Sequence, residues 1–156
     1  MIYIVIGVGV LILDILTKLM VEQYLCPVGS VELIPSVFHL TYVENPGMAF
    51  GMFGGARTVF VIVTILVLGA LAFFYSRTKN RTRFLKVGTA LIYGGAVGNL
   101  LERLAKGYVV DFLDFHLIHF PVFNIADIAV CVGAALLIIH FLVEDKKDTV
   151  KGGEEK

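Results

Sequence analysis

Four long apolar segments constrain the fold of this chain more than any other feature of its sequence. They run over residues 2–21, 58–75, 84–101 and 125–143. Each has about 18–20 residues, the length that a helix needs to cross a hydrocarbon core of about 30 Å. Because lipid offers no hydrogen-bond partner to backbone groups, segments that span it are helical. We therefore predict an all-α polytopic membrane protein with four transmembrane helices.

The composition is that of a chain solvated partly by lipid. Of its 156 residues, 58% are hydrophobic and only 17% are charged, whereas soluble domains carry about 25% charged residues. The net charge is zero, so the basic surface that nucleic-acid binding requires is missing and we expect no nucleic-acid partner. Cys26 and Cys131 lack the spacing of a disulfide framework, and we expect neither a disulfide nor a nucleophile from them.

The uneven distribution of charge predicts the orientation in the membrane. Residues 77–86 hold five charged side chains, all of them positive, and short basic loops face the cytoplasm. With four spans, both termini are then cytoplasmic. We expect residues 1–143 to form a single membrane-embedded domain, and residues 144–156, which hold nine charges, to form a frayed, solvated cytoplasmic tail. Because the first segment lacks a basic start and is interrupted by Asp14 and Lys18, we do not interpret it as a signal peptide.

The two loops on the predicted outer face, residues 22–57 and 102–124, contain more than connecting chain. Residues 31–43 alternate β-branched and aromatic side chains loosely, which predicts a short strand or hairpin broken at Pro35. Residues 47–55 read GMAFGMFGG. This stretch is compatible with a short interfacial helix or a lid on the membrane surface, and equally with a plain linker.

Polar residues inside the apolar segments are costly, so they tend to be paired and functional. Asp14 and Lys18 are spaced i, i+4 on the first predicted helix, so they share a face and can pair. Alternatively, Asp14 and Lys18 form an ion pair with a purely structural role, or Lys18 extends to the membrane interface. Asn99 and Arg103 have the same spacing near the outer end of the third helix. Asn99 must find hydrogen bonds there, either in a site or between helices, and Arg103 can simply extend to the interface.

Two acids, Asp111 and Asp127, fall on the outer side near the lipid boundary. In a partly desolvated site, two neighbouring carboxyl groups share one proton and their pKa values separate. Such a pair can activate a water and protonate a leaving amine. Alternatively, Asp111 is a turn residue, and Asp127 is an acid favoured by a helix N-terminus. Asn124 is placed either to cap the fourth helix or to orient a carboxylate.

Other chemistries have weaker support. A Ser–Lys dyad would need Ser30 or Ser36 beside Lys18. His116 and His119 form an HxxH pattern, but no third ligand stands at a characteristic spacing, so we expect no zinc site and no cofactor.

A non-enzyme interpretation also stays open. A small four-helix proton or cation transporter, or a membrane scaffold, would use Asp14, Asp111 and Asp127 as a relay. This interpretation predicts acids spread through the depth of the membrane, whereas a hydrolytic site predicts two acids that converge at one face.

Five sequence blocks, taken together, resemble the bacterial lipoprotein signal peptidases (signal peptidase II). They are DILTK (14–18), NPGMAFG (45–51), GGAVGNLLER (94–103), GYVVDF (107–112) and FNIAD (123–127). They occur in the order of that family, with the four spans between them, and they cover about the first 143 residues. Each block is a weak signal alone, and the ordered set is specific.

The resemblance implies an intramembrane aspartyl endopeptidase of the bacterial inner membrane, with its active site near the outer face. Such an enzyme removes signal peptides from diacylglyceryl-modified prolipoproteins on the N-terminal side of the lipobox cysteine. The resemblance further implies contact with membrane lipid, inhibition by cyclic peptides of the globomycin type, an outer-face β-structure and a short interfacial helix. It implies no cofactor and no metal.

The resemblance also assigns roles to particular residues. The catalytic pair maps onto Asp111 and Asp127. Substrate-binding or orienting residues are Asn45, Asn99, Arg103 and Asn124, and supporting residues are Asp14, Lys18, Gly47 and Glu102. The chain departs from the family pattern at Ile15, where Gln is usual, and at Glu102, where Asp is usual. We expect Glu102 to support Arg103 rather than to take part in the chemistry.

Overall fold

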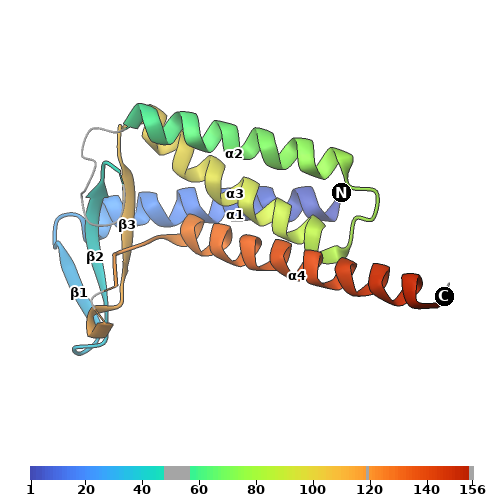
Figure 1. Ribbon diagram of the computed structural model, residues 1–156. Coiled ribbons are helices and arrows are strands. Elements are labelled where there is room, and N and C mark those ends of the chain that lie inside the picture. Colours follow the sequence, from blue (N-terminus) through green and yellow to red (C-terminus); the bar gives the residue numbers. More distant parts are fainter. Residues whose placement is uncertain (48–56, 119, 155–156) are drawn as a thin grey trace.

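The computed structural model describes residues 1–47, 57–118 and 120–154, with their side chains up to Val143 (Figure 1). Its helices are α1 (Ile2–Met20), extended by a π-helical turn (Val21–Leu25), α2 (Arg57–Arg77), α3 (Arg83–Ala105), a short 3₁₀ helix (His116–Ile118) and α4 (Ile125–Glu154). Its strands are β1 (Ser30–Ile34), β2 (Phe38–Asn45) and β3 (Val109–Asp114).

The four predicted spans are confirmed as helices. The helical segments long and apolar enough to cross a membrane are Ile2–Leu25, Arg57–Arg77, Arg83–Ala105 and Ile125–Val143. Each contains the predicted segment, and most extend past it by a few residues. The extensions carry polar residues such as Arg57 and Arg77, because a helix continues into the interface where long cationic side chains reach water.

The last helix differs from the prediction at its C-terminal end. We expected the helix to end at residue 143 and a frayed tail to follow, but α4 continues to Glu154. Lysine and glutamate have high helix propensity. The charged segment after residue 143 is too polar for the membrane core, but it can still continue the helix.

The helices run side by side, and the sheet stands across one end of the bundle (Figure 1). Both termini and the connection between α2 and α3 lie at the opposite end. This arrangement agrees with the predicted grouping of the basic loop with the termini. That this end faces the cytoplasm remains a prediction, which rests on the positive charge of the loop.

Helix α3 is the central element and packs against each of the other three helices. Two adjacent glycines explain how closely its neighbours approach. A methyl group on Gly94 would overlap the carbonyl of Gly7 in α1, and one on Gly95 would overlap the carbonyl of Ala126 in α4. Small residues at these positions bring the backbones together, as is common between membrane helices.

The predicted hairpin is confirmed. Strands β1 and β2 pair antiparallel on either side of the turn that contains Pro35. The prediction did not include β3, which pairs antiparallel with β2 to give the order β1-β2-β3. Gly107, with a φ of +89°, reverses the chain between α3 and β3. The interpretation of Asp111 as a turn residue is therefore wrong, because Asp111 lies within β3. The interfacial helix or lid expected at 47–55 lies, apart from Gly47, outside the described residues.

Candidate active site

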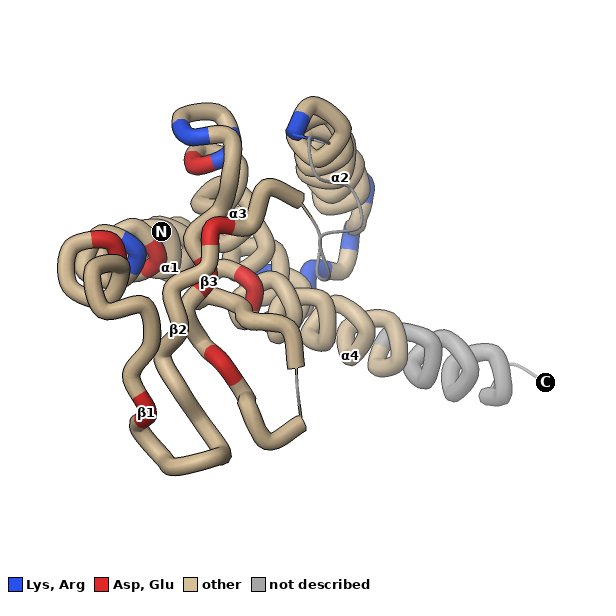
Figure 2. The backbone as a smooth tube through the Cα atoms, turned by 90° about the vertical axis from the view of Figure 1, so that its left-hand side faces the viewer, with Lys and Arg blue, Asp and Glu red and all other residues tan. Residues whose placement is uncertain are grey.

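The sequence-predicted polar residues meet where the sheet closes the end of the helical bundle. Figure 2 looks onto the sheet and shows acidic positions of α1, β3 and α4 around this end of the molecule. Asp14, Asn99, Asp111 and Asn124 are all at most 8% exposed. Buried polar groups must be hydrogen-bonded to be tolerated, so the pattern of donors and acceptors among them is informative.

The start of α4 holds Asp127 through a reciprocal pair of hydrogen bonds. Oδ1 of Asn124 accepts from the backbone N–H of Asp127 at 2.9 Å, and Oδ2 of Asp127 accepts from the backbone N–H of Asn124 at 3.1 Å. This is the geometry of a capping box, so Asp127 is an acid at a helix N-terminus. Capping uses only one of its oxygens. The other oxygen, Oδ1, accepts from Nδ2 of Asn99 at 2.8 Å.

Asp111 is held by side-chain amides at both of its oxygens. Oδ1 accepts from Nδ2 of Asn124 at 2.6 Å, and Oδ2 accepts from Nδ2 of Asn45 at 2.8 Å. Asn124 therefore contacts both acids, Asp111 through its amide nitrogen and Asp127 through its amide oxygen and backbone. The single asparagine links β3 to the first turn of α4.

Burial raises the pKa of the Asp111 carboxyl to about 6. The hydrogen bond from Asn45 acts in the opposite direction because it stabilises the ionised form, and the charge of Asp127 raises the pKa further. Asp111 therefore exchanges its proton close to neutral pH. An acid or base with this property is well matched to proton transfer in hydrolysis.

The orientation of the Asn45 amide is determined by Gly47. The backbone N–H of Gly47 donates to Oδ1 of Asn45 at 3.1 Å. Because the amide oxygen is engaged there, the amide nitrogen faces Asp111 as a donor. The structure thus places Gly47 next to Asn45, and the supporting role that the resemblance implies for Gly47 stays a prediction.

Lys18 orients Asn99 in the same way. Its ammonium group lies 2.7 Å from Oδ1 of Asn99, and it forms ion pairs with Asp14 at 2.8 Å and with Glu102 at 3.0 Å. An ammonium group can only donate, so the oxygen of Asn99 must face Lys18 and its nitrogen must face Asp127. Lys18 is 2% exposed, and it does not extend to the interface.

Asp14 and Glu102 attach the helices to the elements that carry the two acids. Oδ1 of Asp14 accepts from the backbone N–H of Ala126 at 3.0 Å. Oε2 of Glu102 accepts from the backbone N–H of Val110 in β3 at 3.1 Å, and Oε1 pairs with Lys106 at 3.0 Å. These bonds give Glu102 a direct role in holding β3, and its expected support of Arg103 stays a prediction.

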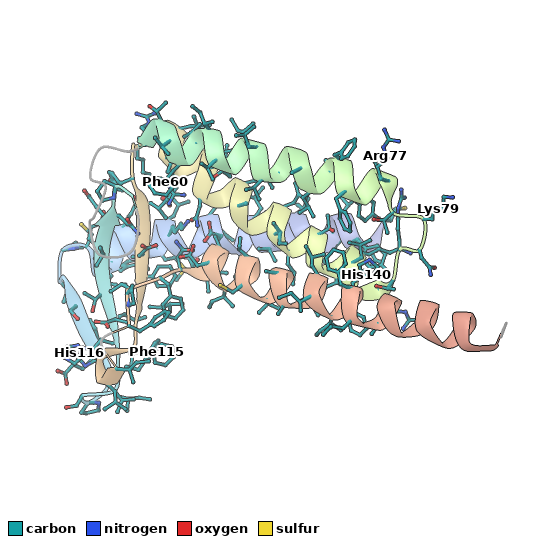
Figure 3. All side chains as sticks on the ribbon, viewed as in Figure 1. Phe60, Arg77, Lys79, Phe115, His116 and His140 are labelled. Carbon is teal, nitrogen blue, oxygen red and sulfur yellow. The ribbon has the colours of Figure 1, made fainter. Side chains whose placement is uncertain are left out.

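A cavity of about 540 Å³ opens beside the two acids. Its polar wall contains Asn45, Arg103, Asp111 and Asp127, and its apolar wall contains Phe60, Phe120, Pro121, Val122, Phe123, Ile128, Cys131 and Val132. The Arg103 guanidinium lies 5.4 Å from the ring centroid of Phe60, which Figure 3 shows at the end of α2 next to the sheet. Arg103 therefore lines the site and does not merely extend toward water.

The structure separates the predicted residues into two groups. Asn45, Arg103, Asp111 and Asp127 line the cavity, whereas Asp14, Lys18 and Glu102 lie behind it and hold the elements together. Two further residues of the cavity wall, Phe60 and Phe120, were not predicted from the sequence. An aromatic residue in or beside an apolar span carries no local signal that distinguishes a cavity wall from a lipid-facing surface.

Fold and site together define a multi-pass membrane protein with a polar, carboxylate-containing centre at one end of its helices. The model of the family described as signal peptidase (SPase) II matches residues 6–143. The lipoprotein signal peptidase of Halothermothrix orenii is 44% identical over 146 residues, which cover 94% of this chain and 98% of that protein. The corresponding protein of Clostridioides difficile is 42% identical, with 94% and 99% covered. The chain belongs to the signal peptidase II family, and it is therefore a peptidase.

Solved structures agree with this assignment. A bacterial membrane enzyme determined by the in meso method at 2.3 Å resolution has a TM-score of 0.82 and 36% identity, with 93% of this chain and 90% of that chain covered. A second, at 1.9 Å, has a TM-score of 0.80 and 37% identity, with 90% and 92% covered. The resemblance stated from the five sequence blocks is thus confirmed.

Proposed function

We propose that this chain is an intramembrane aspartyl endopeptidase that removes signal peptides from diacylglyceryl-modified prolipoproteins. Cleavage falls on the N-terminal side of the lipobox cysteine. Family membership supports the substrate class. The observation that carries the chemical proposal is the placement of Asp111 and Asp127 on one cavity wall, joined through Asn124.

In the proposed mechanism, Asp111 and Asp127 hold one water between them. One carboxylate takes a proton from the water while the other, protonated, polarises the scissile carbonyl. The water oxygen forms a bond to the carbonyl carbon, and the resulting gem-diol collapses as the leaving amine is protonated. The pKa of Asp111 near 6 allows the pair to carry the single shared proton that this sequence requires.

The remaining cavity residues orient the substrate. Arg103 and Asn45 present N–H groups to the peptide backbone, and Asn99 and Asn124 keep the two acids in position. The apolar wall that includes Ile128 and Val132 of α4 suits acyl chains and the signal helix, which enter sideways from the bilayer. Cyclic peptide inhibitors of the globomycin type would occupy the same cavity. We place the enzyme in the bacterial inner membrane, with this cavity near the outer face.

The transporter interpretation requires acids spread through the membrane depth. Asp111 and Asp127 instead converge on one cavity at one end of the bundle, and Asp14 is engaged in an ion pair with Lys18. These observations favour hydrolysis over a relay.

A gel-shift cleavage assay with a diacylglyceryl-modified prolipoprotein tests the proposal. Replacement of either acid by its amide, Asp111→Asn or Asp127→Asn, removes a proton-transfer group and should lower turnover at least about 100-fold. Glu44→Gln is the matched control, because Glu44 is an exposed acid of β2 that does not line the cavity. Near wild-type cleavage by Asp111→Asn would contradict the assignment. Proton flux through reconstituted protein without cleavage would favour the transporter.

A further inference from the structure

A second group of polar side chains crosses the sheet at a distance from the candidate active site. Glu32 of β1 is the register partner of His39 in β2, and His39 is the register partner of Asp114 in β3. Directly opposite residues of antiparallel strands lie on the same face of a sheet. The three side chains therefore form one row, and His116 follows two residues after Asp114.

The ends of these side chains converge. The rings of His39 and His116 stack with their centroids 4.5 Å apart and their planes inclined by 14°. His39, Asp114 and His116 each offer one ligand atom, and these three atoms lie within 4.8 Å of one another. Glu32 lies at the edge of the group, with Oε1 at 3.9 Å from Nε2 of His39.

One ring nitrogen of His39 lies near the Glu32 carboxylate, at 3.9 Å, but too far from it for a hydrogen bond. The His39 side chain is 9% exposed, and among the described residues its buried Nε2 makes no hydrogen bond. A buried polar atom without a partner costs free energy. A metal ion bound at this nitrogen would remove that cost.

The donor set indicates which metal would bind. Two imidazole nitrogens and a carboxylate oxygen are the ligands of zinc sites, whereas calcium and magnesium prefer oxygen ligands. Zinc bonds of about 2.0–2.2 Å would require the three ligand atoms to move closer together around the metal. Thr41 Oγ1 donates to Oδ2 of Asp114 at 2.9 Å and orients this carboxylate, as outer hydrogen bonds do in metal sites.

We propose that His39, Asp114 and His116 form a zinc-binding site, with Glu32 or a water as the fourth ligand. Asp111 and Asp114 are three residues apart in β3, so their side chains leave opposite faces of the strand. Figure 3 shows His116 at the end of the sheet farthest from α2 and Phe60. The metal therefore takes no part in peptide hydrolysis. It joins β2 to the end of β3 and stabilises the sheet that carries Asp111 and Asn45.

The expectation of no zinc site rested on the local HxxH pattern of His116 and His119. In the proposed site the second imidazole comes from His39 of β2, 77 residues away in the sequence from His116. The spacing of residues along the chain could not predict that His39 lies beside Asp114 and His116, because the pairing of β2 with β3 brings them together.

Titration calorimetry with Zn²⁺ on tag-free protein in detergent tests the proposal. The wild type should bind one equivalent of Zn²⁺, and its melting temperature should rise with added metal. His116→Gln and His39→Gln should each weaken binding at least about tenfold, the range seen when metal-site interactions are lost. His116 is exposed, so this variant should fold even if the buried His39 variant does not.

His119→Gln is the control that separates this site from the HxxH pattern, and Cys26→Ser controls for an exposed thiol. The proposal is overturned if saturable binding is absent or if His116→Gln binds Zn²⁺ with wild-type affinity. It is also overturned if His119→Gln abolishes binding while folded His39→Gln retains it. Because cleavage activity is not the readout, these outcomes are independent of the proposed peptidase mechanism.

Discussion

The direction of three asparagine amides determines which groups face the two acids. Gly47 engages the oxygen of Asn45, Lys18 engages the oxygen of Asn99, and the Asp127 N–H engages the oxygen of Asn124. In each case the amide nitrogen is left to donate to a carboxylate. The ammonium group of Lys18 and the backbone N–H groups of Gly47 and Asp127 thus determine which amide nitrogens donate to the two acids. A reversed amide would place its buried N–H donors against these other donors.

The pH dependence of cleavage should reflect the raised pKa of Asp111. If activity requires one shared proton, kcat/KM should fall by about tenfold per pH unit above the raised pKa of Asp111, about 6. The hydrogen bond from Asn45 lowers this pKa. Its removal in Asn45→Ala should therefore shift the falling limb to higher pH.

A hydrogen bond to a charged group contributes about 1.5 kcal/mol, so we expect a shift of about one pH unit. The measurement is a pH profile of kcat/KM in matched buffers, with Glu44→Gln as the control. A falling limb that stays in place or moves to lower pH in Asn45→Ala would show that this hydrogen bond does not tune the reacting pair.

At the scale of elements, the close contact between α3 and α4 positions the second acid. Gly95 of α3 faces the carbonyl of Ala126, which immediately precedes Asp127. In the same first turn of α4, the backbone N–H of Ala126 donates to the Asp14 carboxylate of α1. Three helices therefore determine where the Asp127 carboxylate lies relative to β3.

Gly95→Ala should displace the first turn of α4, because the added methyl group would overlap the carbonyl of Ala126. We expect lower thermal stability, by about 1–3 kcal/mol for overpacking, and reduced cleavage. Gly69→Ala is the matched control, since nothing lies within 4 Å of a methyl group on Gly69 in α2. Alanine has the higher helix propensity, so this variant should be as stable as the wild type or slightly more stable. Equal effects of the two substitutions in a thermal unfolding assay would count against the close contact.

At the scale of the whole molecule, the sheet and the basic loop lie at opposite ends of the four helices (Figure 1). Short basic loops remain in the cytoplasm during insertion. The sheet, the cavity and both candidate catalytic acids would then face outward, on the side that we propose for prolipoprotein cleavage.

Cysteine labelling in intact cells tests this orientation. Cys26, which is free and exposed at the sheet end of α1, should react with a membrane-impermeant maleimide in a Cys131→Ser background. Lys79→Cys, placed in the loop between α2 and α3 in a chain without other cysteines, should react only after the membrane is permeabilised. The reverse pattern would show that the sheet faces the cytoplasm.

The four spans, the hairpin and the polar residues that needed an explanation could all be predicted from the sequence. These features depend on segment length, on alternation and on the cost of polar groups in lipid, all of which are local properties. The pairing of Asp14 with Lys18 could be predicted because helical spacing places them on one face.

The contacts among these residues could not be predicted in this way and became apparent from the folded chain. Strand β3, the capping role of Asp127, the amide orientations and the apolar wall with Phe60 all depend on contacts between residues distant in the sequence. The stacking of His39 on His116 has the same origin. Such contacts form when strands pair and helices pack. The sequence of one segment does not show which distant segment will lie beside it in the fold.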